Sequence, residues 1–179
     1  ILGGYTYTAG PVPYKYKGAG SFAVFFLMGP LMAWPAWFIQ TGQYSWLPVW
    51  GSLPVGFLVA AILNGNDVRD IAHDRAAGIV TPVTELGSFA GLGLQRFLYW
   101  AAFISLVALV AVGTLPYTAL LPLALFLPLK KALCTIGEAA AGKQAALLQL
   151  EAMAAGFHFQ FGILLTAGVA LHRVVGKGL

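Results

Sequence analysis

Two long uncharged stretches dominate the sequence. Residues 18–66 and 97–129 contain no Asp, Glu, Lys or Arg. A membrane helix needs about 20 apolar residues, so each stretch is too long for one span and must contain a break. The segments TGQYS and GTLPY supply these breaks. With the apolar run near the end of the chain, the pattern predicts five helices, at about 20–40, 47–65, 88–113, 116–130 and 152–172.

The composition places these helices in a membrane. Hydrophobic residues make up 59% of the chain, charged residues make up 9%, and the mean hydropathy is +0.81. A soluble domain carries roughly 25% charged residues, so this chain cannot cover itself with a polar surface. The single cysteine excludes a disulfide within the chain and a cysteine-rich metal site. We therefore expect an all-α integral membrane bundle of about five transmembrane helices, forming one membrane domain over residues 1–179.

The basic residues lie mostly on one side of this topology. Five spans place the segment before the first helix, the polar loop 66–86 and the polar segment 130–151 on the same side. That side receives eight basic residues: Lys15, Lys17, Arg69, Arg75, Arg96, Lys130, Lys131 and Lys143. The other side receives only Arg173 and Lys177. Scattered basic residues of this kind set membrane orientation rather than bind nucleic acid. They predict that loop 66–86 faces the cytoplasm. We expect the membrane to be a bacterial or archaeal inner membrane.

The acidic residues are concentrated in loop 66–86. Four of the six in the chain, Asp67, Asp70, Asp74 and Glu85, fall within nineteen positions. The first three are spaced by three and four residues, which places their carboxylates on one face of a helix. Like charges on one face repel each other unless a cation lies among them. The other two acidic residues, Glu138 and Glu151, are expected to form surface pairs with Lys143.

This DxxDxxxD pattern is typical of a site for Mg²⁺ and a diphosphate. Mg²⁺ prefers oxygen ligands and usually takes one or two protein carboxylates, with substrate phosphates and water in its other positions. The predicted metal-binding and catalytic residues are Asp67, Asp70 and Asp74. Asn66 adds a neutral oxygen, and Arg69 and Arg75 can bind a diphosphate through forked hydrogen bonds. The alternative is a solvated loop whose carboxylates pair with its two arginines.

The segment NDVRDIAHDRAAGIVTPVTELG, residues 66–87, resembles the second aspartate-rich motif of the UbiA superfamily of intramembrane prenyltransferases. The resemblance is to the 1,4-dihydroxy-2-naphthoate polyprenyltransferase branch, which acts in menaquinone synthesis. The matching residues are Asn66, Arg69, Asp70, Asp74, Gly78, Thr81, Leu86 and Gly87. Residues 7–20 are similar to the segment before the fifth helix of that family, and residues 157–171 to its last helix. The resemblance covers essentially all 179 residues.

The resemblance implies an Mg²⁺-dependent aromatic prenyltransferase. In such an enzyme, aspartates hold Mg²⁺, which neutralises the diphosphate leaving a polyprenyl diphosphate. An electron-rich aromatic acceptor then captures the allylic cation, and in this branch the acceptor is a dihydroxynaphthoate-like ring used in quinone biosynthesis. The helices would enclose the isoprenoid tail and would themselves be surrounded by membrane lipid.

Two features depart from the family pattern. Ile79 occupies a position where the family usually has a lysine after the glycine of the motif. The family also has nine helices and two aspartate-rich motifs, whereas this chain corresponds to helices five to nine with the second motif only. Three explanations stay open. The chain is a fragment of the full enzyme, or its other half is a separate chain, or it is a noncatalytic subunit packed among other membrane subunits in a larger complex.

Overall fold

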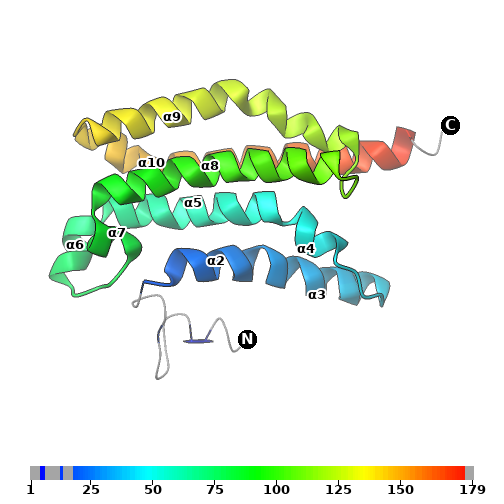
Figure 1. Ribbon diagram of the computed structural model, residues 1–179, viewed down its shortest axis with the longest axis horizontal. Coiled ribbons are helices and arrows are strands. Elements are labelled where there is room, and N and C mark those ends of the chain that lie inside the picture. Colours follow the sequence, from blue (N-terminus) through cyan, green and yellow to red (C-terminus); the bar gives the residue numbers. More distant parts are fainter. Residues whose placement is uncertain (1–4, 7–12, 14–17, 176–179) are drawn as a thin grey trace.

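The computed structural model describes residues 5–6, 13 and 18–175, and this part of the chain is all-α. Its long helices lie side by side along one axis (Figure 1). In chain order the elements are α2 (Gly20–Met28), α3 (Pro30–Thr41), α4 (Leu47–Gly51), α5 (Leu53–Arg69), α6 (Ile71–Ala76), α7 (Pro82–Leu86), α8 (Ser88–Ala111), the 3₁₀ helix η2 (Tyr117–Leu125), α9 (Phe126–Ala140) and α10 (Gln144–Val175). Lys15 and Lys17 lie outside the described residues, as does most of the segment 7–20.

Four segments of the described chain are long and apolar enough to cross a membrane. They are Gly20–Thr41, Ser88–Ala111, Tyr117–Ala140 and Gln144–Val174. These segments correspond to the first, third, fourth and fifth predicted helices. The second predicted helix is not among them and is divided at Ser52 into α4 and the 17-residue α5. The first predicted helix is likewise divided, at Gly29, into α2 and α3. Each of α4 and α5 has a proline in its first turn, where the missing N–H removes no helical hydrogen bond.

Three helices extend into the polar segments beyond the predicted bounds of about 65, 130 and 152. α5 continues to Arg69, α9 continues to Ala140, and α10 begins at Gln144. Charged residues mark where a helix leaves the apolar layer, but they do not interrupt its hydrogen bonds. α9 ends only shortly before Gly142, which has a φ of 86°. Glycine adopts this left-handed conformation without strain, so it is a common residue just after a helix.

α5 packs against α2, α8 and α10, and glycines allow these contacts to be close. A Cβ atom on Gly65 of α5 would lie 3.0 Å from the backbone nitrogen of Glu151 in α10. A Cβ atom on Gly91 of α8 would lie 2.6 Å from Cγ2 of Val68 in α5. Small residues at crossings let helices approach closely in membrane bundles. The C-terminal part of α5 is therefore held between α8 and α10.

The helix connections lie at two opposite ends of the bundle. Figure 1 shows α6, α7 and the α9–α10 connection at one end, and the α3–α4 and α8–η2 connections at the other. We call the first of these the charged end, and it includes the last turn of α5. Its arrangement agrees with the up-and-down topology predicted from the sequence. Its position on the cytoplasmic side of the membrane stays a prediction.

Candidate functional site

The aspartate-rich motif lies at the charged end, where α5 is followed by α6. Asp70 separates the two helices, with φ −98° and ψ 10°. Asp70 ends the hydrogen-bond pattern of α5 and begins that of α6. The N–H of Asp70 donates to the carbonyl of Asn66 at 3.0 Å, and the N–H of Asp74 donates to the carbonyl of Asp70 at 2.9 Å. The motif is therefore helical on both sides of Asp70, but it does not form the one continuous helix that would place all three carboxylates on a single face.

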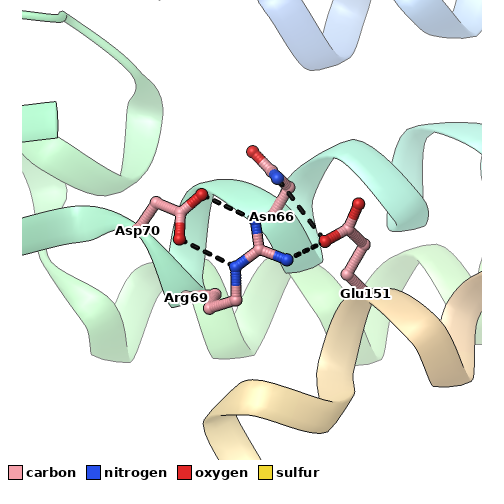
Figure 2. Close-up of polar contacts among 4 residues, drawn as sticks. All are labelled: Asn66, Arg69, Asp70 and Glu151. Carbon is pink, nitrogen blue, oxygen red and sulfur yellow. Dashed lines mark hydrogen bonds and ion pairs between the residues drawn. The ribbon is translucent and has the colours of Figure 1, made fainter. Parts of the chain in front are cut away.

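Arg69 is the centre of a group of polar side chains from α5, α10 and the residue between α5 and α6 (Figure 2). Its Nε and Nη2 atoms donate to the two carboxylate oxygens of Asp70, each at 2.7 Å. Its Nη1 atom donates to Oε2 of Glu151, which also accepts a hydrogen bond from Nδ2 of Asn66 at 3.5 Å. One guanidinium thus joins the motif to the last helix of the chain.

The charge of this group is net negative. The hydrogen bond from Arg69 lowers the pKa of Asp70 below its usual value, so Asp70 is ionised at neutral pH. One guanidinium and two carboxylates, those of Asp70 and Glu151, give a formal charge of −1. A diphosphate is itself anionic, so it would be repelled by this group unless a cation accompanied it or a carboxylate moved away.

The three predicted metal ligands do not converge on one point. Asp67 is buried, with 5% of its surface exposed, Asp70 is bound to Arg69, and Asp74 is half-buried in α6. Within the described ranges, no group of three or more His, Cys, Asp or Glu side chains is placed to hold a metal ion. Their oxygens nevertheless suit Mg²⁺, which needs only one or two protein carboxylates when substrate phosphates complete its shell. These residues fit a shared Mg²⁺–diphosphate site and do not fit a closed protein cage.

Arg75 stabilises the turn that follows the motif. Its Nε and Nη2 atoms donate to the backbone carbonyl of Thr84, at 3.0 and 2.9 Å. Thr84 and Thr81 form a capping box at the start of α7, in which each hydroxyl accepts from the other residue's backbone N–H, at 2.8 and 3.1 Å. Two of the five N–H groups of Arg75 are bound in this way. Its contact with a diphosphate stays a prediction.

A buried polar network supports α5 just before the motif. Nδ2 of Asn64 donates to Oε1 of Gln95 at 2.6 Å and to the carbonyl of Gly91 at 2.9 Å. Nε2 of Gln95 donates to the carbonyl of Ala61 at 3.0 Å. Both side chains are fully buried. Hydrogen bonds of this kind between membrane helices resist sliding, so the network fixes α5 relative to α8.

Glu151 is the residue of this site that sequence reasoning missed. The expected pair with Lys143 is formed by Glu138 alone, at 3.1 Å, and Glu151 pairs with Arg69 instead. The only signal in the sequence was an acidic residue at the start of an apolar helix, in a chain with few acidic residues. Its partner is 82 positions away and is brought near only by the crossing of α5 and α10.

An apolar pocket of about 380 Å³ opens between α2, α5 and α8. Its lining includes Phe22, Phe25, Phe57, Phe97 and Ala60. Ala60 and Asp67 are seven residues apart on α5, so they lie on the same face, about two turns from each other. Pockets of this size and lining suit an apolar ligand. The pocket therefore places apolar volume about two helical turns from Asp67.

Sequence comparison identifies the family of this chain. The UbiA prenyltransferase family matches over residues 1–155. A UbiA prenyltransferase domain-containing protein 1 from Dictyostelium discoideum is 34% identical over 100 residues, covering 52% of this chain and 30% of that protein. The 1,4-dihydroxy-2-naphthoate octaprenyltransferase of Bacillus subtilis is 33% identical over 110 residues, covering 62% and 35%. The Haemophilus influenzae protein of the same name is 32% identical over 121 residues, covering 66% and 38%.

The chain belongs to the UbiA prenyltransferase family, because the family matches well over half of its length. This confirms the resemblance seen in the motif at residues 66–87. The chain spans only 30% to 38% of the length of these three relatives. No solved structure matches it.

Proposed function

We propose that this protein takes part in the Mg²⁺-dependent transfer of a polyprenyl group from a polyprenyl diphosphate to an aromatic acceptor. The acceptor would be a dihydroxynaphthoate-like ring, and the product would enter quinone biosynthesis. Membership of the UbiA prenyltransferase family supports prenyl transfer in general. The names of the Bacillus subtilis and Haemophilus influenzae relatives support the naphthoate acceptor.

The observation that carries the proposal is the group formed by Asp70, Arg69 and Glu151 at the charged end of an apolar bundle. Its net negative charge favours a divalent cation, and its arginine favours a phosphate oxygen. A cation and a phosphate are the two parts of a metal–diphosphate complex. Asp67 lies one helical turn before Asp70 and adds a further carboxylate, and Asp74 lies one turn after it.

In the proposed site, the polar residues would stabilise the charge of the diphosphate, and the apolar pocket would exclude water. Mg²⁺, held by one or two of the carboxylates Asp67, Asp70 and Asp74, would neutralise the leaving diphosphate. Arg69 makes three hydrogen bonds in the group of Figure 2, which leaves two of its five N–H groups to donate to a phosphate oxygen. Asn66 and Arg75 would add donors on either side of it. The phenylalanine-lined pocket between α2, α5 and α8 would hold isoprenoid carbons away from water.

In the proposed reaction, the bond between the allylic carbon and the diphosphate oxygen breaks, and the electron pair leaves with the diphosphate. The allylic cation then forms a carbon–carbon bond with the aromatic ring, which afterwards releases a proton or another electrofuge. Stabilisation of the departing negative charge is the main contribution asked of the protein. Dry apolar walls prevent water from capturing the cation first.

The proposal is tested by prenyl transfer in membranes that contain the whole protein. Labelled farnesyl diphosphate and 1,4-dihydroxy-2-naphthoate serve as substrates, and the labelled lipid product is counted. Asp70→Ala and Asp74→Ala are each expected to lower transfer by at least about 100-fold, because they remove charge that neutralises the transition state. Glu138→Gln is the matched control, since Glu138 lies outside the motif and pairs with Lys143. Transfer that both alanine variants leave unchanged would instead support the noncatalytic subunit.

A further inference from the structure

The carboxylate of Glu151 approaches the motif from a different helix. It lies on α10, whereas Asn66 and Arg69 lie on the last turn of α5. The same oxygen, Oε2, accepts hydrogen bonds from Arg69 Nη1 and Asn66 Nδ2. Figure 2 shows the guanidinium between Asp70 on one side and Glu151 on the other. Glu151 therefore contacts two of the three residues predicted to bind the diphosphate.

We propose that Glu151 is a positioning residue for the diphosphate site, which it serves by fixing the orientation of Arg69 and Asn66. The inference rests on the proposed function and assigns part of its site to the last helix. Glu151 acts through its two partners and does not itself need to touch the substrate. Removing it would leave the binding groups in the protein but would no longer hold them in one geometry.

The position of Glu151 is fixed by the backbone. At the crossing with α5, a Cβ atom on Gly65 would lie 3.0 Å from the Glu151 nitrogen and 3.1 Å from its Cα. The two helices are therefore in contact one turn before Arg69, and this contact fixes the backbone position of Glu151 on α10. Leu150, the preceding residue, is fully buried and also holds this part of α10 in place.

The position of the arginine, in contrast, depends on its partners. Arg69 is on the last turn of α5, and its partly exposed guanidinium is held by ion pairs with Asp70 and Glu151. Asp70 binds one edge of the guanidinium plane and Glu151 binds a third nitrogen, which together define the direction of the plane. Two N–H groups then remain in a fixed direction for a ligand. Prearranged donors bind a ligand more tightly because no freedom is lost on binding.

A purely structural role for Glu151 predicts that its loss lowers the stability of the fold and leaves diphosphate binding unchanged. Ion pairs between partly exposed side chains contribute little to stability, and both members of this pair are about one third exposed. Loss of Glu151 should therefore affect unfolding only slightly and should affect diphosphate binding much more. A competing role, in which Glu151 occupies the place of the diphosphate, predicts tighter binding when Glu151 is removed.

The experiment measures the binding of labelled farnesyl diphosphate, with Mg²⁺, to the whole protein in lipid nanodiscs. Glu151→Ala is expected to weaken binding about tenfold, because the freed Arg69 side chain would have to be ordered when the ligand binds. Glu151→Gln, whose amide oxygen still accepts from Arg69, should recover part of this loss. In the Arg69→Ala background, Glu151→Ala should add much less, because Glu151 acts mainly through Arg69. Glu138→Gln is the charge-matched control and should bind as the unchanged protein does.

In the transfer assay, Glu151→Ala should raise the KM for farnesyl diphosphate more than it lowers kcat, and the melting temperature should hardly change. Unchanged or tighter binding in both Glu151 variants, while Arg69→Ala weakens binding, would overturn the positioning role and leave the proposed function intact. An absence of effect in Arg69→Ala and Asp70→Ala as well would overturn the proposed function itself. A large fall in melting temperature in both Glu151 variants, with unchanged affinity, would assign Glu151 to stability alone.

Discussion

Gly65 of α5 and Glu151 of α10 meet at their backbones, because a Cβ atom on Gly65 would lie 3.0 Å from the Glu151 nitrogen. A side chain at position 65 would fit only if the backbone of α10 moved by a few tenths of an ångström. It also brings the carboxylate of Glu151 to Arg69, one turn further along α5. One close contact between helices that are far apart in the sequence therefore builds the charged group at the end of the bundle.

Gly65→Ala is expected to destabilise the protein by about 1–3 kcal/mol, the usual cost of an added carbon in a packed crossing. The atoms in contact are backbone atoms of Leu150 and Glu151, which cannot rotate away as a side chain could. Thermal unfolding in detergent measures the effect. Gly93→Ala on α8 is the control, since a Cβ atom there would have no neighbour within 4 Å. It should leave stability unchanged or raise it by up to about 1 kcal/mol. Equal melting temperatures for the two variants would contradict the close crossing.

The pair between Asp70 and Arg69 predicts a particular dependence of stability on pH. Arg69 lowers the pKa of Asp70 in the folded protein. The pair therefore stabilises the fold above the unfolded value of about 3.9, and this contribution is lost as the pH falls through the lower folded value. At pH 7, Asp70→Asn should lower the melting temperature slightly, since the group is about one third exposed. The difference should shrink as the pH falls below about 4. A constant difference down to pH 3 would show that Asp70 is not held by Arg69.

A cysteine introduced at Ala141 can report the orientation of the charged end. Ala141 is exposed between α9 and α10, outside both neighbouring candidate spans, whereas Cys134 lies within the span Tyr117–Ala140. If the charged end faces the cytoplasm, a membrane-impermeant maleimide should label Ala141→Cys, in a Cys134→Ser background, in inside-out vesicles but not in intact cells. Cys134→Ser alone identifies any signal from cysteines elsewhere in the protein. Labelling of intact cells would reverse the predicted orientation.

The hydrophobic pattern was sufficient to predict the all-α membrane fold and the approximate positions of its helices. The uncharged stretches of more than 30 residues are helical on both sides of the breaks at TGQYS and GTLPY. The helical conformation on either side of Asp70 also followed from the spacing of the aspartates, although the break at Asp70 did not. Both properties depend on local sequence, because hydropathy and a period of 3.6 residues can be read directly along the chain.

The ends of the helices and the pairing of charges could not be predicted in this way. The sequence suggested that α5 and α9 end where polar residues begin, but polar residues continue a helix readily once its hydrogen bonds are formed. The partner of Glu151 depends on which helices cross, and Lys143 was the nearer candidate in the sequence. Gln95 gave no sequence signal either, since its role depends on Asn64 of another helix.

The central claim, that the carboxylates of the motif hold a divalent cation together with a diphosphate, is tested most directly by Mn²⁺ binding. Mn²⁺ replaces Mg²⁺ at oxygen sites, and its free concentration can be followed by electron paramagnetic resonance. The titration uses the whole protein in nanodiscs, with and without farnesyl diphosphate. The account predicts that farnesyl diphosphate increases Mn²⁺ binding to the unchanged protein. It also predicts that this increase disappears in the folded triple variant Asp67→Asn, Asp70→Asn and Asp74→Asn. An equal increase in that variant would contradict the claim.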